Sequence, residues 1–397
     1  MVSPGCSRHS EGNRSVYRRI AVLAAAVLVV AGIALPNAAG SRSLQVGIYD
    51  DSAILGSPVK TFPLLKQLRA QVVRVTLNWG GRGPTSVARR KPEKQTDPAD
   101  PAYRWGIYDA IVKRAAENKI KVMFSIVGAP AWANGGKRWN HAPSGTAALR
   151  AFTFAAATRY SGDFTPEDAE EALPGVRLWL AWNEPNDPVF LTPQYGRVGK
   201  GRYVVQSARD YARICNAVVA GVRAALLSGE KVGCGATGPR GNDKPVSKRA
   251  SVSPLTFLRA MRRAGARGFD AYAHHPYYGR PTESPMKPPS TGITLANIGR
   301  LTKEVTRLYG PKRIWITEYG YQTRPPDPFF GVSWALQARY LSQAFAIARR
   351  NPRIDMMIWF LLRDEPRLRG KDGWQSGLIT KSGKKKPAYT TFRRLRH

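Results

Sequence analysis

The chain has 397 residues, of which 43% are hydrophobic, so it can bury the core of one large domain or two smaller ones, and this composition excludes a mainly disordered protein. The formal net charge of +35 favours encounters with polyanions such as nucleic acid, anionic cell-envelope polymers or acidic polysaccharides. A generic basic surface is the simpler alternative, because the cations are spread along the chain and no nucleic-acid-binding motif accompanies them.

Residues 1–40 have the pattern of an export signal. Arginines near the start precede an uninterrupted apolar run at Ile20–Leu35, and small residues follow it. We predict a signal peptide or, because the run approaches membrane-spanning length, an uncleaved N-terminal anchor. Residues 41–397 would then be secreted or displayed at the cell surface. Removal of residues 1–40 takes away four Arg and one Glu, a loss of three positive charges that leaves +32 of the +35.

Three cysteines bear on the redox state of the protein. Cys6 lies in the predicted signal, which leaves Cys215 and Cys234 as the thiols of the exported part. They could form one disulfide or stay as two buried free thiols. We predict the disulfide, because export places the pair in an oxidising compartment.

After the signal, short apolar or β-branched runs alternate with longer helical patterns, which is typical of parallel βα units. The eight predicted strands are Leu44–Ile48, Val72–Leu77, Val122–Ile126, Val176–Ala181, Lys231–Gly235, Phe269–Ala273, Arg313–Thr317 and Asp355–Phe360. The clearest helical periodicity covers Ile107–Asn118, Ala147–Tyr160, Tyr203–Leu227, Pro254–Ala264, Leu295–Tyr309 and Ser333–Arg349, with a closing helix near Tyr389–Leu395.

Eight such units with no linker or repeat between them predict a single (β/α)₈ barrel, a TIM barrel, over residues 41–397. Two stretches break the rhythm, at Gly80–Pro101 and Tyr278–Pro289. Each follows a predicted strand, so we expect both loops on the C-terminal face of the barrel, where active sites are built.

Two carboxyl groups stand where that face would be. Trp182-Asn183-Glu184-Pro185 ends the fourth predicted strand, and Thr317-Glu318-Tyr319 ends the seventh. Hydrolysis of a glycoside with retention requires one carboxyl group to protonate the leaving oxygen and a second to attack the anomeric carbon, about 5–5.5 Å away. Strand ends converge around the mouth of a barrel, so these two glutamates are expected to face each other across a sugar.

This arrangement resembles the clan A glycoside hydrolases, which include cellulase-type, mannanase-type and β-xylosidase-type barrels. The resemblance covers nearly the whole chain after the signal. It implies that Glu184 is the acid/base, that Glu318 is the nucleophile, and that the bond cleaved is a β-type linkage of a poly- or oligosaccharide. No cofactor is implied.

Further residues are expected to support the two glutamates or to contact the sugar. Arg74 on the second strand should pair with Glu318 and keep it ionised, and the ionised Glu318 should raise the pKa of Glu184. Asn183 can donate to the sugar 2-hydroxyl. Tyr277 can donate to Glu318, and His275 can orient the acid/base. For the substrate we expect Trp359 to offer a flat floor beneath the sugar, and Trp132, which follows the third strand, to line a subsite or serve in packing.

Other functions are less well supported. His274 and His275 invite a metal site, but neighbours on a strand point to opposite faces and no cysteine or carboxylate stands at ligand spacing nearby in the sequence. We therefore expect no catalytic metal. A carbohydrate-binding barrel without turnover and a transglycosylase remain alternatives, and specific nucleic-acid binding would rest on charge alone.

Overall fold

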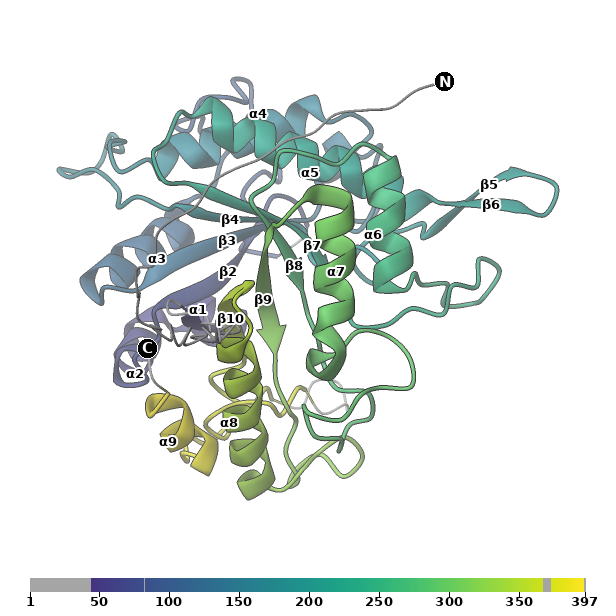
Figure 1. Cartoon of the computed structure of the whole chain (residues 1–397). Helices are drawn as coiled ribbons and strands as arrows, with labels where there is room; N and C mark the ends of the chain where they lie inside the picture. The colour runs from purple at the N-terminus through teal and green to yellow at the C-terminus, as the bar shows by residue number, and fades with distance from the viewer. Residues whose placement is uncertain (1–43, 82, 367–372, 396–397) are drawn as a thin grey trace, which may run out of the picture. The chain divides into compact units, whose positions relative to one another are not determined.

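The computed structural model describes residues 44–81, 83–366 and 373–395, and these form a closed barrel of parallel strands wrapped by helices (Figure 1). The strands pair in the order β1-β10-β9-β8-β7-β4-β3-β2, which confirms the predicted TIM barrel. Every predicted barrel strand is present, and its ends lie within two residues of those expected. The strands are β1 Gln45–Tyr49, β2 Val72–Asn78, β3 Lys121–Val127, β4 Leu178–Ala181, β7 Lys231–Thr237, β8 Ala271–His274, β9 Arg313–Tyr319 and β10 Ile354–Phe360.

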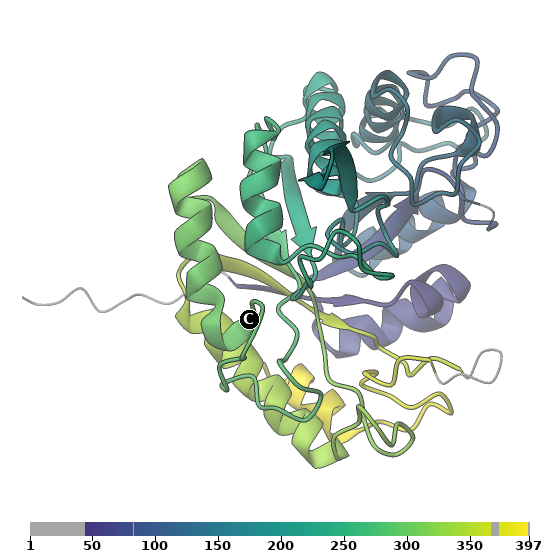
Figure 2. The same cartoon turned by 90° about the vertical axis from the view of Figure 1, so that its right-hand side faces the viewer.

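The helices cover the outside of the barrel, as the turned view shows (Figure 2). Those that were predicted are α3 Gly106–Glu117, α4 Ala147–Arg159, α5 Gln206–Ala224, α6 Pro254–Arg263, α7 Ile298–Tyr309, α8 Trp334–Arg350 and α9 Pro387–Arg393. Two 3-10 turns occur as well, η1 at Ala131–Ala133 and η2 at Leu295–Asn297.

The structure departs from the prediction in three regions. Residues 51–67, for which no helix was predicted, form α1 Asp51–Gly56 and α2 Pro58–Gln67, and α2 contains Pro63, a residue that disfavours helix interiors. The helix predicted from Tyr203 starts at Gln206 instead. The residues before it belong to an antiparallel hairpin, β5 Tyr195–Gly199 and β6 Arg202–Val205, which suits their β-branched and aromatic side chains.

The core has two layers, as expected for a barrel. Inside the barrel, apolar side chains from successive strands fill the lumen around Trp315, and a Cβ added to Gly233 would lie 2.7 Å from its ring. A larger apolar layer lies between the strands and the helices, and Phe124 belongs to it. The filled lumen means that any ligand must bind at the mouth rather than pass through the barrel.

The predicted targeting segment, residues 1–40, lies outside the described residues. Within the part of the chain that is described, no helix is both long and apolar enough to cross a membrane.

A disulfide joins Cys215 on α5 to Cys234 on β7, as predicted. Both cysteines are fully buried, and their Cα atoms lie 6.0 Å apart. The bond ties the helix that follows the fourth barrel strand to the fifth barrel strand. Two residues beyond Cys234, the backbone of β7 reaches the site described below.

Loss of this bond should destabilise the fold. In the chain-entropy account, closing a loop of 19 residues contributes about 3 kcal/mol, so the Cys215→Ala/Cys234→Ala variant should lose roughly that much free energy of unfolding. Denaturant titration of the two proteins measures the difference. Thiol titration of the denatured, unreduced wild type should detect no free thiol at these positions, and two thiols per chain would contradict the bond.

Candidate active site

Two carboxylates meet at the C-terminal mouth of the barrel. Glu184 lies just beyond β4, and Glu318 lies near the end of β9. One carboxylate oxygen of each, together with a ring nitrogen of His275, lies within 4.8 Å of the others. The side chain of Glu184 is 18% exposed and that of Glu318 is 12% exposed. Both acids are therefore mostly buried and lie close together.

A local irregularity of β9 aims Glu318 into the mouth. Between the pairs Ile316–Met357 and Tyr319–Trp359, β9 advances three residues while β10 advances two. The extra residue breaks the alternation of the strand, which is the usual effect of a β-bulge. Thr317 and Glu318 can both contact the site as a result.

The turn that carries Glu184 holds two residues in a left-handed backbone conformation. Trp182 has φ +63° and Glu184 has φ +34°, which are uncommon for residues with a side chain. The amide of Glu184 donates to the carbonyl of Ala236 on β7, and a Cβ added to Gly238 would lie 3.2 Å from the Glu184 carboxyl group. Backbone strain of this kind is concentrated at functional sites, where the surrounding structure holds it in place.

Arg74 on β2 links Glu318 to Asn183, the residue before Glu184. Its guanidinium is fully buried and donates to the Glu318 carboxylate at 3.1 Å and to the Asn183 side-chain oxygen at 2.5 Å. It also donates to Ser125 Oγ and to the carbonyl of Thr317. The pairing of Arg74 with Glu318 that the sequence predicted is therefore present.

His275 and Tyr277, which follow β8, complete the contacts. One ring nitrogen of His275 lies 2.8 Å from a Glu184 oxygen, and the other lies 3.0 Å from Thr317 Oγ1. The hydroxyl of Tyr277 donates to Glu318 at 2.9 Å. Burial lowers the pKa of His275 to about 3, so its ring is neutral at neutral pH and orients Glu184 without adding a charge.

The two carboxyl groups differ in their surroundings. Burial and then the nearby Asp187 raise the pKa of Glu184 to about 8, against a weaker opposing effect of Arg74. Burial also raises the pKa of Glu318, and the charge of Glu184 adds to the rise, while His275, Arg74 and the Tyr277 hydroxyl oppose it. The direction expected for Glu184 is present, but its main causes are burial and Asp187 rather than the charge of Glu318.

No carboxylate stands at ligand spacing from His275 in the sequence, but the fold brings two carboxylates next to it. Glu184 and Glu318 come from other strands and form with His275 a group whose spacing could hold a metal ion. Both oxygens of Glu318 are already engaged, one by the Arg74 cation and the other by Tyr277. A cation there would be repelled by Arg74, so the chemistry of the group suits acid–base work better than metal binding.

Trp359 does not have the position expected of a sugar floor. Its side chain is fully buried in the layer between the strands and the helices, and its indole N–H donates to the carbonyl of Ser376. Successive residues of a strand point to opposite faces, so the next residue, Phe360, takes the place expected for Trp359. Phe360 is half-buried and lies 5.5 Å from the ring of Tyr49, which itself lies under the Arg74 guanidinium.

Further aromatic rings surround the acids. Trp374, 44% exposed, contacts both Phe360 and Tyr277, with ring centroids 5.8 Å and 6.2 Å away. Together with Tyr49 these rings border the mouth beside Glu318. Tyr49 and Phe360 were not singled out from the sequence. A strand-end aromatic on the inward-facing parity was the signal that could have identified Phe360.

Trp132 takes part in packing. It lies in η1, its indole N–H donates to the carbonyl of Ala88, and its ring meets Trp79 edge-on at 5.9 Å. These contacts tie the β3–α4 loop to the long loop after β2. Of the two roles considered for Trp132, the contacts favour packing over a subsite.

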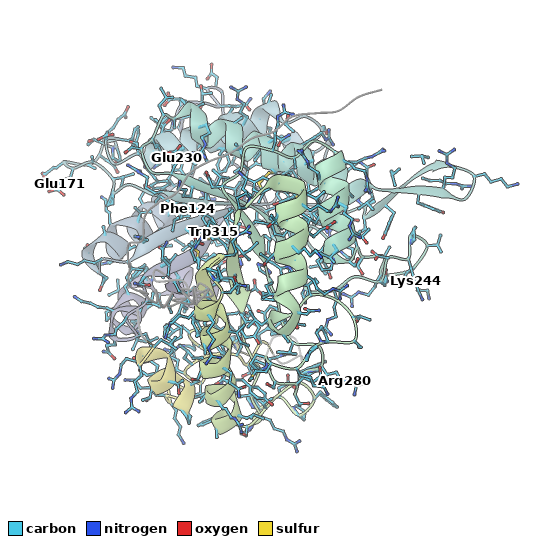
Figure 3. All side chains as sticks on the ribbon, viewed as in Figure 1. Phe124, Glu171, Glu230, Lys244, Arg280 and Trp315 are labelled. Atoms are coloured by element: carbon cyan, nitrogen blue, oxygen red, sulfur yellow. A yellow bond between two sulfur atoms is a disulfide. The ribbon has the colours of Figure 1, made fainter. Side chains whose placement is uncertain are left out.

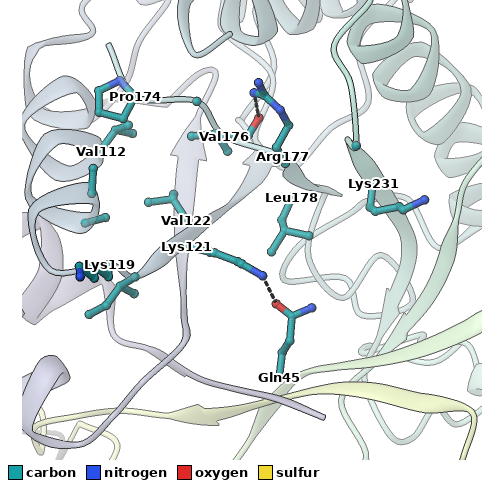
Figure 4. Close-up of a pocket in the computed structure, with 15 residues that line it drawn as sticks. Gln45, Val112, Lys119, Lys121, Val122, Pro174, Val176, Arg177, Leu178 and Lys231 are labelled. Carbon is teal, nitrogen blue, oxygen red and sulfur yellow. Dashed lines mark hydrogen bonds between the residues drawn. The ribbon is translucent and has the colours of Figure 1, made fainter. Parts of the chain in front are cut away.

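Two cavities lie at opposite ends of the barrel. One of about 300 Å³ opens at the ends of β2 and β3, where Asn78, Trp139 and Phe190 line it. A cavity of about 470 Å³ lies at the opposite, N-terminal face among Gln45, Lys121 and neighbouring residues (Figure 4). That second cavity contains none of the site residues named above.

Comparison with known proteins bears on the fold. The sequence matches no protein-family model and none of the curated proteins searched. Among solved structures, a family 39 glycoside hydrolase from Bacteroides cellulosilyticus is 18% identical (TM-score 0.59), with 90% of this chain and 64% of that chain covered. A family 39 β-xylosidase from Caulobacter crescentus is 15% identical (TM-score 0.56), with 90% and 72% covered. A family 1 β-glucosidase from Thermotoga maritima is 12% identical (TM-score 0.55), with 88% and 97% covered.

The fold is that of the clan A glycoside hydrolases. This chain spans slightly less than two thirds of the first of those structures, so that protein contains additional parts. Identities this low establish the clan A fold and leave the activity to be argued from the site.

The raised pKa of Glu184 can be measured without any substrate. In protein labelled with ¹³C at glutamate carboxyls, one signal should titrate near pH 8, because burial and Asp187 disfavour the charged form. The signal should be missing in Glu184→Gln. In Asp187→Asn its midpoint should fall, since one of the two causes is removed. A wild-type spectrum in which every glutamate titrates below about pH 6 would contradict the assignment.

Proposed function

We propose that the chain is a retaining glycoside hydrolase that cleaves β-type bonds of a poly- or oligosaccharide through a covalent glycosyl-enzyme. The observation that carries the proposal is the pair of carboxylates with oxygens within 4.8 Å in the mouth of a clan A barrel. Inverting enzymes hold their carboxyl groups about 6.5–9.5 Å apart to admit a water, so the shorter spacing favours direct attack by one carboxylate.

In the first step, Glu318 attacks the anomeric carbon as the bond to the leaving oxygen breaks. Arg74 and Tyr277 hold the two oxygens of Glu318 and favour its ionised form. Glu184 gives its proton to the leaving oxygen, and its pKa of about 8 keeps that proton available at neutral pH.

In the second step, Glu184, now a carboxylate, takes a proton from water as the water oxygen attacks the same carbon. The bond to Glu318 breaks and its carboxylate is restored, so no net change of the enzyme remains. Asn183 accepts from Arg74 through its side-chain oxygen, which leaves its amide hydrogens free for the sugar 2-hydroxyl.

We also propose that the enzyme acts outside the cytoplasm, secreted or at the cell surface. The apolar run at Ile20–Leu35 and the buried Cys215–Cys234 disulfide support this location.

The two glutamates should give variants that differ in kind. Glu318→Ala lacks the nucleophile, so turnover should collapse for every substrate, whatever its leaving group. Glu184→Ala lacks the proton donor, so a dinitrophenyl glycoside should still form the glycosyl-enzyme, which then accumulates. Azide needs no general base and should release the sugar from this glycosyl-enzyme as a β-glycosyl azide. Azide rescue of Glu318→Ala should instead give the α-glycosyl azide. NMR of the products distinguishes the anomers.

Opposite stereochemistry in the two rescues would exchange the roles of Glu184 and Glu318. Inversion at the anomeric carbon by the wild type would end the retaining mechanism.

The finding that Phe360 rather than Trp359 faces the mouth gives a second test. Phe360→Ala should raise KM for a β-aryl glycoside about tenfold, because the sugar loses an apolar face beside Glu318. Trp359→Phe should leave KM within about twofold and instead lower the free energy of unfolding by about 1–3 kcal/mol, through a small cavity and the unpaired Ser376 carbonyl. If Trp359→Phe raised KM and Phe360→Ala did not, Trp359 would be the floor after all.

A further inference from the structure

Two exposed basic segments flank the turn that carries Glu184. The first is the β5–β6 hairpin, residues 195–205, which projects from the barrel in Figure 1. The second is the β7–α6 loop, residues 238–253. We call these two segments the basic arms. They carry seven exposed cations and one carboxylate, Asp243; the cations are Arg197, Lys200, Arg202, Arg240, Lys244, Lys248 and Arg249.

Buried side chains fix both arms to the acid/base turn. Gln194, immediately before the hairpin, donates to the carbonyl of Pro185, the residue after Glu184. Asn186 is fully buried, and its amide group donates to three carbonyls of the β7–α6 loop, at Gly238, Arg240 and Val252. The bases of the arms are therefore set against the turn that holds the proton donor.

The cations of the arms lack anionic partners. Over residues 44–81, 83–366 and 373–395, none of the seven forms an ion pair, whereas some cations on the surrounding helices, such as Arg213, Arg259 and Arg307, pair with carboxylates. The carboxylate of Asp243 accepts from the Ser253 amide and the Thr256 hydroxyl, so it is engaged in capping α6. Like charges gathered without counter-charges repel each other, and an anionic ligand would relieve that repulsion.

The charge is distributed unevenly over the barrel. Within the α4–β4 loop, residues 161–175 carry five carboxylates and no Lys or Arg. In Figure 3 its Glu171 points to solvent on the opposite side of the molecule from Lys244 of the basic arms.

We propose that the basic arms bind the leaving-group end of an anionic glycan chain. This inference rests on the proposed function, because Glu184 protonates the leaving oxygen and the severed chain must therefore extend on its side of the mouth. Carboxylates or sulfates repeated along a polysaccharide would meet Lys and Arg in succession, and the exposed ring of Tyr203 on β6 offers a face for a sugar.

Matched lysine variants test the surface by binding alone. The arm variant Lys200→Gln/Lys244→Gln/Lys248→Gln removes three exposed cations, and the control Lys66→Gln/Lys113→Gln/Lys119→Gln removes three from the α2–α3 side of the barrel. Both are made in a Glu318→Gln background so that the ligand is not consumed, and thermal unfolding checks that each is folded. The probe is a fluorescein-labelled oligogalacturonate of about ten sugars, followed by anisotropy from about 50 to 300 mM NaCl.

We expect the arm variant to bind the probe about tenfold more weakly than the parent at low salt and to show a shallower dependence on salt, since fewer counter-ions are released. The control should change by less than about twofold, and a neutral xylo-oligosaccharide should distinguish none of the three proteins. Equal losses in the arm and control variants would overturn the inference, as would an unchanged arm variant.

A single-stranded oligonucleotide of the same charge separates glycan from nucleic acid. Equal or tighter binding of the oligonucleotide by the parent would overturn the glycan assignment. Failure of the wild type to cleave any glycoside, with arm-dependent binding of the oligogalacturonate intact, would instead remove the proposed hydrolase activity and leave the binding surface standing.

Discussion

The site depends on one buried cation, Arg74. A guanidinium removed from water costs several kcal/mol unless its hydrogen bonds and charge are satisfied. Here the satisfying groups come from β3, β4 and β9, while the ring of Tyr49 on β1 lies 4.2 Å from the guanidinium carbon. Strands far apart in the chain must therefore close around Arg74, and closing the barrel brings Glu318 and Asn183 to fixed positions. The stability of the barrel and the geometry of its mouth share this interaction.

Around that cation, two chemically identical side chains acquire different properties. Burial raises the pKa of both acids, but Glu318 has an ion pair with Arg74 and a phenolic donor that oppose the shift, whereas the charge of Asp187 adds to the shift of Glu184. Both are shielded from water, which strengthens each of these influences. The division between a proton donor and a nucleophile follows from the neighbours that the barrel supplies.

The turn after β4 joins this chemistry to the outer surface. Asn186 and Gln194 connect the backbone beside Glu184 to two loops that carry uncompensated positive charge, and β7, which supports the same turn at Ala236, is tied to α5 by the disulfide. The loops are therefore joined to the turn of Glu184 by buried hydrogen bonds. The positive charge of the basic arms thus has a defined position relative to the mouth.

The sequence by itself determined the barrel, its eight strands and the two glutamates, because strand periodicity and residues at strand ends are local patterns. It also indicated the partners of Glu318, since Arg74 and Tyr277 stand at strand positions that converge in any such barrel. Only the tertiary structure decided that Phe360 and not Trp359 faces the mouth, and that carboxylates surround His275. Facing in a strand reverses with a shift of one residue, and β10 contains such an irregularity between Ile354 and Met356, where it advances two residues against one of β9. The causes of the raised pKa of Glu184 could not be predicted from the sequence either, because burial and the distance to Asp187 exist only once the chain has folded.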